Sequence, residues 1–248
     1  MHGAAKTIFG ALNDLLFPPL CLGCQQRLAS SRPPLLCLEC FNKLIFIHSP
    51  LCLLCGTPFP GGADHLCGEC LSGRHFFDLA RSLCLYCPPL SDLILALKFN
   101  GRLTGITTFR ALFDQSPLFD IFTTPDIILP VPLHKKRLRQ RGFNQAQLIS
   151  SGCFLQWRKK IVLDVLTRHR LTTPQAALSG SKRRKNVCDV FSLSRPDQVA
   201  GARVLLIDDV YTTGSTVNAC SRLLRKAGAE RIEVFTLARS LGSVKTNR

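Results

Sequence analysis

The spacing of hydrophobic residues changes from segment to segment along the chain. Short apolar segments rich in β-branched residues and bounded by charge predict buried strands; they are 76–86, 126–131, 203–208 and 231–238. Apolar side chains that recur every three or four residues predict helices; these segments are 8–20 (ended by Pro18), 90–98, 103–113, 144–160 and 217–227. Beyond Pro88, predicted strands and helices therefore alternate.

Alternating strands and helices favour right-handed β-α-β units. We therefore expect an α/β fold with a mostly parallel sheet and helices on both faces. Ligands of such sheets bind beyond the carboxyl ends of the strands. Two of the predicted strands, ending at Val131 and at Asp208, are followed by residues that bear chemistry.

The segment 204–216, VLLIDDVYTTGST, combines a buried strand, two acids and a small hydroxylated loop that leads into a helix. Backbone N–H groups at the start of a helix favour a phosphate. Paired carboxylates, here Asp208 and Asp209, accept hydrogen bonds from sugar hydroxyls. A ligand that needs both is a sugar phosphate. The competing interpretation is an ordinary strand-to-helix turn in which an Asp caps the helix.

These residues resemble the phosphoribosyltransferase signature, in which apolar residues precede two acids and a Thr-Thr-Gly-x-Thr loop. The resemblance implies a type I phosphoribosyltransferase-like fold that binds phosphoribosyl pyrophosphate (PRPP). Asp208 and Asp209 would be the catalytic acids that hold the ribose. The 5′-phosphate would bind Thr212, Thr213, Gly214, Ser215 and Thr216. Tyr211 departs from the signature, which prefers an aliphatic residue there.

Thirteen cysteines in a chain without an evident export signal favour metal binding over disulfides, which are the alternative. Eight of them form four Cys-x-x-Cys pairs, each of which places two sulfurs on one turn: Cys21/Cys24, Cys37/Cys40, Cys52/Cys55 and Cys67/Cys70. Eight thiolates fill two four-coordinate structural zinc sites. The spacing does not decide whether neighbouring or alternating pairs share a metal.

The chain is thus predicted to have two parts. Residues 1–73 would form an N-terminal helix and a double zinc-ribbon module, and residues 74–248 the phosphoribosyltransferase-like domain. A fifth pair, Cys84 and Cys87, lies at the end of the first predicted strand of that domain, where we interpret the cysteines as small buried residues on opposite faces.

Positive charge is concentrated in the second part of the chain. Residues 91–248 carry 26 Lys or Arg against 11 Asp or Glu, whereas residues 1–90 carry 6 against 5. Such an imbalance favours anionic partners. Five cations lie within 135–141, directly after the strand that ends at Val131, and they are followed by the segment 141–145, RGFNQ. By charge alone, the basic run 135–141 could equally be a solvated loop.

The Val-Pro-Leu strand end, the basic run and the RGFNQ segment together resemble the ComF (competence protein F) family, as do Leu97-Lys98-Phe99 and Thr173-Pro174-Gln175. That family joins a multi-cysteine zinc module to a phosphoribosyltransferase domain. By this resemblance, the turn at 132–137 would meet the pyrophosphate of PRPP through Lys135, Lys136 and Arg137. Mg²⁺ would accompany the ligand.

The resemblance also implies handling of single-stranded DNA during natural transformation. Two basic runs would form the nucleic-acid surface: Arg139 and Arg141 in the first, and Lys182, Arg183, Arg184 and Lys185 in the second. The second run lies in the polar segment 172–196, which resembles the mobile loop that covers the substrate in phosphoribosyltransferases; by composition it could equally be a linker.

Two function classes follow. The first is a ComF-like protein that binds PRPP and Mg²⁺ and handles single-stranded DNA, with DNA-uptake, helicase or recombination proteins as partners. The second is an active phosphoribosyltransferase in metabolism, although no residue indicates its acceptor nucleophile. No segment is long and apolar enough to span a membrane. We therefore expect a cytoplasmic protein, or one peripheral to the inner membrane.

Overall fold

A computed structural model of the chain describes residues 18–73, 75–100, 105–169 and 190–241. Most of the predicted helix at 8–20 lies outside these residues. So does most of the predicted lid, including the basic run from Lys182 to Lys185. Among the described residues, no helix is both long and apolar enough to cross a membrane.

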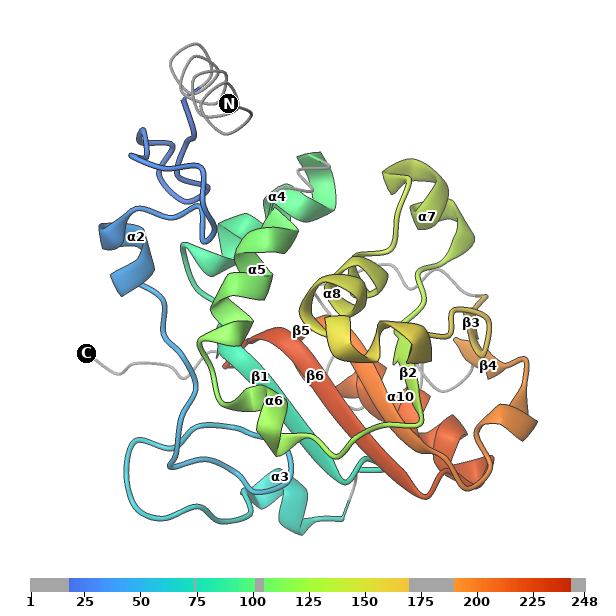
Figure 1. Cartoon of the computed structure of the whole chain (residues 1–248). Coiled ribbons are helices and arrows are strands. Elements are labelled where there is room, and N and C mark those ends of the chain that lie inside the picture. The colour runs from blue at the N-terminus through green and yellow to red at the C-terminus, as the bar shows by residue number, and fades with distance from the viewer. Residues whose placement is uncertain (1–17, 74, 101–104, 170–189, 242–248) are drawn as a thin grey trace, which may run out of the picture.

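Four parallel strands form the central sheet, in the order β1-β6-β5-β2 (Figure 1). The strands are β1 (Leu79–Leu85), β2 (Ile127–Pro130), β5 (Arg203–Tyr211) and β6 (Arg231–Arg239). The mostly parallel sheet is therefore confirmed. Strand β5 continues three residues past its predicted end at Asp208, because Val210 and Tyr211 still pair with β6.

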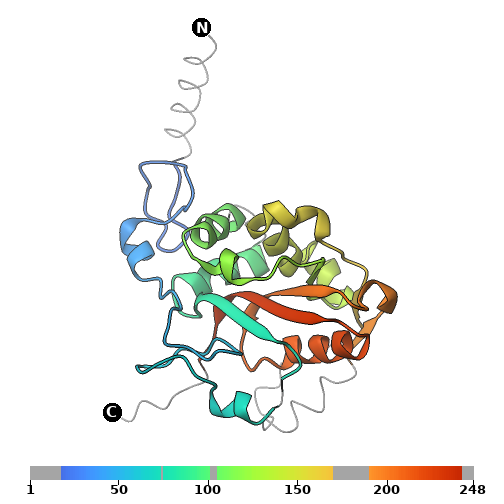
Figure 2. The same cartoon turned by 60° about the horizontal axis from the view of Figure 1, so that its bottom comes forward.

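Helices cover both faces of the sheet, as predicted (Figure 2). One face carries α4 (Leu90–Asn100), α5 (Gly105–Asp114), α6 (Leu118–Ile121) and α8 (Gln145–Cys153). The other carries α10 (Ser215–Lys226). Successive strand residues point to opposite faces, so Ile207 packs into the core beneath α5 and α8, whereas Leu206 packs into the core beneath α10.

The prediction of one continuous helix over 144–160 was wrong. Helix α8 ends at Cys153, Phe154 leaves the helical conformation, and a 3₁₀ helix, η1 (Leu155–Lys160), follows. Phe154 and Trp157 are both buried and their rings stack with centroids 5.9 Å apart. The break lets both aromatic side chains enter one core, which outweighs the helical periodicity of the sequence.

A small antiparallel pair flanks the central sheet. It consists of β3 (Leu166–Arg168) and β4 (Phe191–Leu193), with Arg168 opposite Phe191. A short 3₁₀ helix, η2 (Pro196–Gln198), then leads into β5.

The cysteine-rich segment wraps around the edge of the sheet at β1. Its first half, with α2 (Leu38–Asn42), contributes Cys21 and Cys40 to the core that contains Ile207. Its second half, with α3 (Gly68–Leu71), contributes Cys52 and Cys55 to the core on the opposite face. Between the two halves, the amide of Ile47 donates to the Leu83 carbonyl of β1 at 3.1 Å. This contact covers an edge that would otherwise be open to pairing.

Candidate functional site

The two predicted acids lie in the carboxyl-terminal half of β5, three and two residues before its last residue, Tyr211. The backbone N–H of Asp209 donates to Oδ1 of Asp208 at 2.9 Å, which fixes the Asp208 carboxylate beside the strand. Neither residue caps α10, because the cap position is occupied by Gly214. The ordinary helix-capping interpretation of these acids is therefore excluded.

Asp209 forms an ion pair with a residue of α4. Its Oδ2 lies 2.7 Å from Nζ of Lys98, and both side chains are largely buried, with exposed fractions of 15% and 19%. Charge-assisted hydrogen bonds in such partly buried positions are stronger than those at the surface. Lys98 therefore holds the Asp209 carboxylate in place at the strand end.

Asp208 has an unusual protonation equilibrium. Burial, followed by the negative charge of Asp209, raises the pKa of Asp208 from 3.8 to about 7. The positive charges of Lys98 and Arg168 act in the opposite direction. A carboxyl whose pKa lies near neutrality gains or loses its proton according to what binds beside it.

The loop that follows the acids has the features of an anion site. Gly214 adopts a left-handed conformation (φ 68°) and is followed by α10, whose free N–H groups lie at this end. The hydroxyls of Thr213 and Ser215 lie 2.7 Å apart. Thr212 and Thr213 are exposed. The loop thus offers backbone and hydroxyl donors to a ligand from solvent.

The packing of Tyr211 also requires a glycine at position 214. A Cβ at this position would lie 2.2 Å from the hydroxyl oxygen of Tyr211, so the buried Tyr211 side chain packs directly against the loop backbone. Tyr211, which departs from the general signature, therefore supports the loop from beneath.

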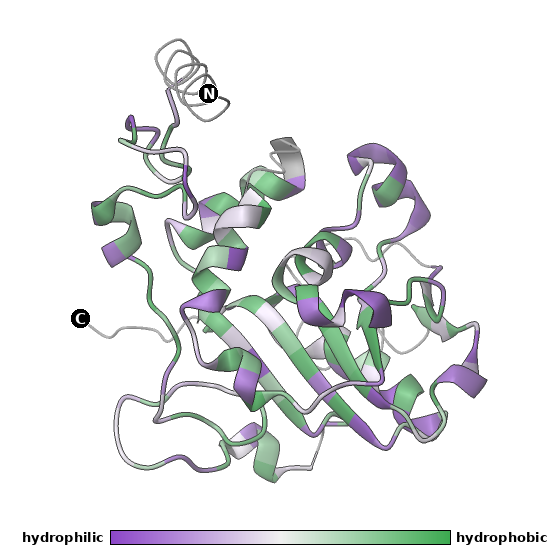
Figure 3. Ribbon diagram, viewed as in Figure 1, coloured by the Kyte–Doolittle hydropathy of each residue, from purple (hydrophilic) through white to green (hydrophobic). Residues whose placement is uncertain are grey.

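The basic run after β2 differs from its prediction as a loop. The turn ends at His134, and 135–141 forms helix α7 (Lys135–Arg141), a hydrophilic helix beyond the strand ends (Figures 1 and 3). The His134 ring caps it by accepting from the amide of Lys136, and Gly142 ends it with a positive φ of 79°. Local caps thus make this segment helical in spite of its charge.

The cations of α7 divide into two sets. Arg137 and Arg141 are half-buried and lie one helical turn apart, whereas Lys135, Lys136 and Arg139 are exposed. Burial, followed by the charge of Arg137, lowers the pKa of Arg141, and Asp209 counteracts this effect. Arg141 therefore lies close enough to Asp209 to interact with its charge, and Arg137 lies close to Arg141.

Asn144 connects the elements on either side of α7. Its Nδ2 donates to the Val131 carbonyl at 3.0 Å and its Oδ1 accepts from the amide of Ala146 at 3.0 Å. One side chain thus ties the end of β2 to the start of α8, and this accounts structurally for the Asn in the RGFNQ segment.

Two residues at this site were not among the predicted site residues. Lys98 comes from α4 and Arg168 from the end of β3. Burial, followed by the charge of Arg137, lowers the pKa of Arg168, and Asp208 counteracts this effect. Lys98 lies in a segment that carried the family resemblance, which was a usable signal. Arg168 is one cation among many in the sequence, and only the fold brings it to the acids.

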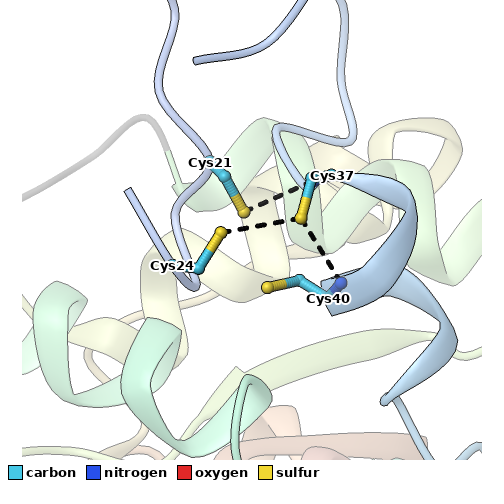
Figure 4. A group of neighbouring side chains, drawn as sticks. All are labelled: Cys21, Cys24, Cys37 and Cys40. Carbon is cyan, nitrogen blue, oxygen red and sulfur yellow. Dashed lines mark hydrogen bonds between the residues drawn. The ribbon is translucent and has the colours of Figure 1, made fainter. Parts of the chain in front are cut away.

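The eight paired cysteines form two groups of four, with neighbouring pairs in each: Cys21, Cys24, Cys37 and Cys40, and Cys52, Cys55, Cys67 and Cys70. Within each group the ligand atoms lie within 4.8 Å of one another, and Figure 4 shows the first group converging on one point. A tetrahedral zinc with bonds of about 2.3 Å requires sulfurs about 3.8 Å apart. The observed separations of 3.6 Å (Cys24 and Cys37) and 3.8 Å (Cys55 and Cys67) fit that requirement.

Backbone donors favour one thiolate in each group. The amide of Cys37 donates to Sγ of Cys21, and the amide of Cys67 donates to Sγ of Cys52, both at 3.3 Å. In the absence of metal, burial raises the pKa of Cys40 and of Cys70. Burial also acts to raise the pKa of Cys21 and of Cys52, but the hydrogen bonds from these amides and from further backbone groups outweigh it and lower each pKa to about 6. Both groups therefore fit zinc, and four thiolates leave no open coordination position for catalysis.

Cys84 and Cys87 form no metal group with other residues of the described segments. Cys84 is buried in β1, as expected. Cys87 lies two residues beyond the end of the strand, so the prediction that the two cysteines occupy opposite faces of one strand was wrong.

Comparison with known proteins identifies both parts of the chain. Residues 12–71 match the double zinc ribbon domain, and residues 159–247 match the phosphoribosyl transferase domain. The class is therefore a phosphoribosyltransferase-fold protein with an N-terminal double zinc ribbon.

Full-length relatives define the family. The chain is 34% identical to Competence protein F of Haemophilus influenzae, over 89% of this chain and 90% of the relative. It is 35% identical to DNA utilization protein YhgH of Escherichia coli K12, over 92% and 100%, and 30% identical to Competence protein ComFC of Bacillus subtilis, over 82% and 84%. The chain belongs to the ComF family.

Proposed function

We propose that this protein binds PRPP with Mg²⁺ at the carboxyl end of β5 and acts in the handling of single-stranded DNA during DNA uptake. The observation that carries the first part is the acidic pair beside the Gly214 loop, with half-buried Arg141 of α7 close enough to Asp209 to interact with its charge. This arrangement offers hydroxyl acceptors, phosphate donors and cations on one side of the sheet.

The parts of PRPP would be divided among these groups. Thr212 to Thr216 bind the 5′-phosphate, and Asp208 and Asp209 accept hydrogen bonds from the ribose hydroxyls. Of the three cations first assigned to the pyrophosphate, we retain Arg137 and add Arg141. Mg²⁺ favours carboxylate and phosphate oxygens, and would neutralise charge on the pyrophosphate.

The DNA part is supported by the exposed face of α7 and by the names of the relatives. Lys135, Lys136 and Arg139 point to solvent at the same side of the sheet as the acids. We assign them to the DNA backbone, together with Lys182 to Lys185, which lie outside the described residues. The relatives are named for competence and DNA utilization. Partners would then be DNA-uptake, helicase or recombination proteins, met in the cytoplasm or at the inner membrane.

Active phosphoribosyl transfer is the second candidate, and the pKa of Asp208 is the observation that favours it. A carboxyl with a pKa of about 7 is matched to accept a proton from an incoming nucleophile at neutral pH. The acceptor would be found by monitoring pyrophosphate release from PRPP in the presence of candidate bases, amines and ammonia. Release that is independent of every nucleophile tried would count against this candidate.

The binding proposal is tested by calorimetry with PRPP and Mg²⁺. Asp208→Asn combined with Asp209→Asn should abolish binding while the protein stays folded. Asp197→Asn is the matched control, because Asp197 is an exposed acid on η2, before the opposite end of β5. Equal affinities for the wild type and the double variant would refute PRPP binding at this site.

A further inference from the structure

A buried arginine connects the second cysteine group to the end of the sheet. Arg239, the last residue of β6, is only 6% exposed. Its Nη1 donates to the Cys55 carbonyl at 2.7 Å, and its Nη2 lies 3.4 Å from Sγ of Cys55 and also contacts the hydroxyl of Thr57. The guanidinium therefore binds both the backbone and the sulfur of a residue in the cysteine group.

The same guanidinium lies against the loop-supporting tyrosine. Its Cζ is 4.2 Å from the centre of the Tyr211 ring, which is within the range of a cation–π contact. The hydroxyl end of Tyr211 in turn packs on Gly214 at the centre of the loop. A continuous chain of contacts thus runs from Cys55 through Arg239 and Tyr211 to Gly214.

A second buried arginine also contacts the second cysteine group, but none of its described hydrogen bonds reaches the residues that support the loop. Arg81 of β1 is also buried, and its guanidinium donates to the Leu53 carbonyl at 3.1 Å and to the Ala80 carbonyl at 2.8 Å. Like Arg239, it meets the backbone of the second cysteine group. Its described hydrogen bonds all go to that region and to its own strand, away from Tyr211.

The charges explain why both arginines can be buried here. Zinc with four thiolates carries a net charge of −2, which two guanidinium groups balance. A buried cation without a compensating charge is strongly unfavourable. We therefore expect the position of Arg239 to depend on whether the group that contains Cys55 holds its metal. The first group joins the domain elsewhere, where the Leu35 amide donates to Thr108 on α5.

We propose that Arg239 and Tyr211 are positioning residues that couple metal in the second cysteine group, Cys52, Cys55, Cys67 and Cys70, to the shape of the Thr212–Thr216 loop. The ligand-binding consequence rests on the proposed function, whereas the coupling itself does not. In this proposal, metal in the second group fixes the position of the Arg239 guanidinium. The guanidinium then positions the Tyr211 ring, and the ring supports the loop backbone at Gly214. Coupling is reciprocal, so a ligand on the loop raises the affinity of the second cysteine group for that metal.

The first experiment measures the loop without any ligand. Hydrogen exchange of peptides that cover 211–219 is followed in zinc-loaded, full-length protein. Arg239→Met and Tyr211→Leu should each speed exchange in this segment, and Arg239→Lys should do so less, because it keeps the charge but loses the planar stacking group. Arg81→Met is the matched control: it should speed zinc release to a chromogenic chelator and leave exchange at 211–219 as in the wild type. Wild-type exchange at 211–219 in both Arg239→Met and Tyr211→Leu would overturn the coupling.

The second experiment adds PRPP and Mg²⁺. In an equilibrium titration of the wild type, the chelator should remove zinc in two steps, and the ligand should raise the chelator concentration needed for the second step about tenfold, a typical coupling. This shift should disappear in Arg239→Met and Tyr211→Leu and persist in Arg81→Met. If PRPP binds but shifts neither step, the coupling is wrong. If PRPP does not bind while exchange behaves as expected, the coupling stands and the proposed ligand is wrong.

Discussion

Nζ of Lys98 lies 2.7 Å from Oδ2 of Asp209, so a helix near the start of the domain holds an acid on its central strand. The positive charge of Lys98 offsets the repulsion between the adjacent carboxylates of Asp208 and Asp209. Without the lysine, the pKa of Asp208 should rise further, because Lys98 is one of the positive charges that lower it.

Lys98→Met should lower the free energy of unfolding by about 2 kcal/mol, the contribution of a hydrogen bond to a charged group. It should also weaken PRPP binding near neutral pH. Chemical denaturation and calorimetry measure the two effects. The matched control is Lys43→Met, since Lys43 pairs with Glu39 at the surface, where both side chains are more than half exposed. An ion pair of that kind is screened by solvent and contributes much less. Equal losses in the two variants would show that the Lys98 pair has no special role.

Asp208 should make stability depend on pH. Its pKa in the folded protein, about 7, exceeds its ordinary value of 3.8, so the folded state binds the proton more tightly than the unfolded state does. This contribution to stability is complete below 3.8 and is lost as the pH rises through about 7. Asp208→Asn should remove that loss. Chemical denaturation of the wild type and of Asp208→Asn across this pH range tests the prediction. Parallel curves of stability against pH for the two proteins would contradict it.

The affinity for PRPP should increase with pH, whereas the stability contributed by Asp208 decreases. The ionised carboxylate is the stronger acceptor for ribose hydroxyls, so the dissociation constant of PRPP should fall as the pH rises through about 7. In Asp209→Asn the transition should move to lower pH, because the neighbouring negative charge is gone. A dissociation constant that does not change with pH would show that Asp208 is already ionised in the free protein.

Single-stranded DNA should bind in a salt-dependent manner through the exposed cations of α7. Replacement of Lys135, Lys136 and Arg139 by alanine should reduce the slope of log K against log salt by about 2, since each phosphate contact contributes about 0.7. Arg158→Ala with Lys159→Ala is the control, because these exposed cations lie on η1. Fluorescence anisotropy at several salt concentrations measures both. An unchanged slope in the α7 variant would place the DNA elsewhere.

The purified protein should contain about two zinc ions per chain, one in each group of four thiols. The first group should lose its metal sooner, because Cys24 is exposed whereas Cys52 and Cys55 are buried. Metal analysis of Cys24→Ser and Cys55→Ser should each show about one ion fewer, with a larger loss of stability for Cys55→Ser. Full disulfide formation in metal-free native protein would contradict this assignment.

Gly214→Ala should disturb the loop for two reasons, a positive φ of 68° and a clash with the Tyr211 hydroxyl. Gly62→Ala separates these effects, because Gly62 also has a positive φ (94°) but has open space where a Cβ would be. Strain alone costs about 1 to 3 kcal/mol. Gly214→Ala should therefore lose more stability than Gly62→Ala in thermal unfolding, and should alone lose PRPP binding. Equal effects would mean that the tyrosine contact is unimportant.

The features that lie within one short segment could be predicted from the sequence. The acidic strand end at Asp208 and the cysteine pairs depend on local order and spacing. Residues brought together by packing could not be assigned in this way: Lys98 and Arg168 reach the acids from separate elements, and the neighbouring pairing of the zinc ligands depends on how the chain turns between them. The break at Phe154 escaped prediction because core packing competes with a periodicity that continues through it.

The position of β1 beside β6 has a consequence for synthesis of the protein. The earliest strand of the sheet has its described partner in the latest, so the sheet cannot close until Arg239 has left the ribosome. The cysteine groups are complete far earlier, by Cys70. All eight zinc ligands are therefore available before β6 has been synthesised, and a polypeptide terminated before residue 231 would keep that side of β1 open to aggregation.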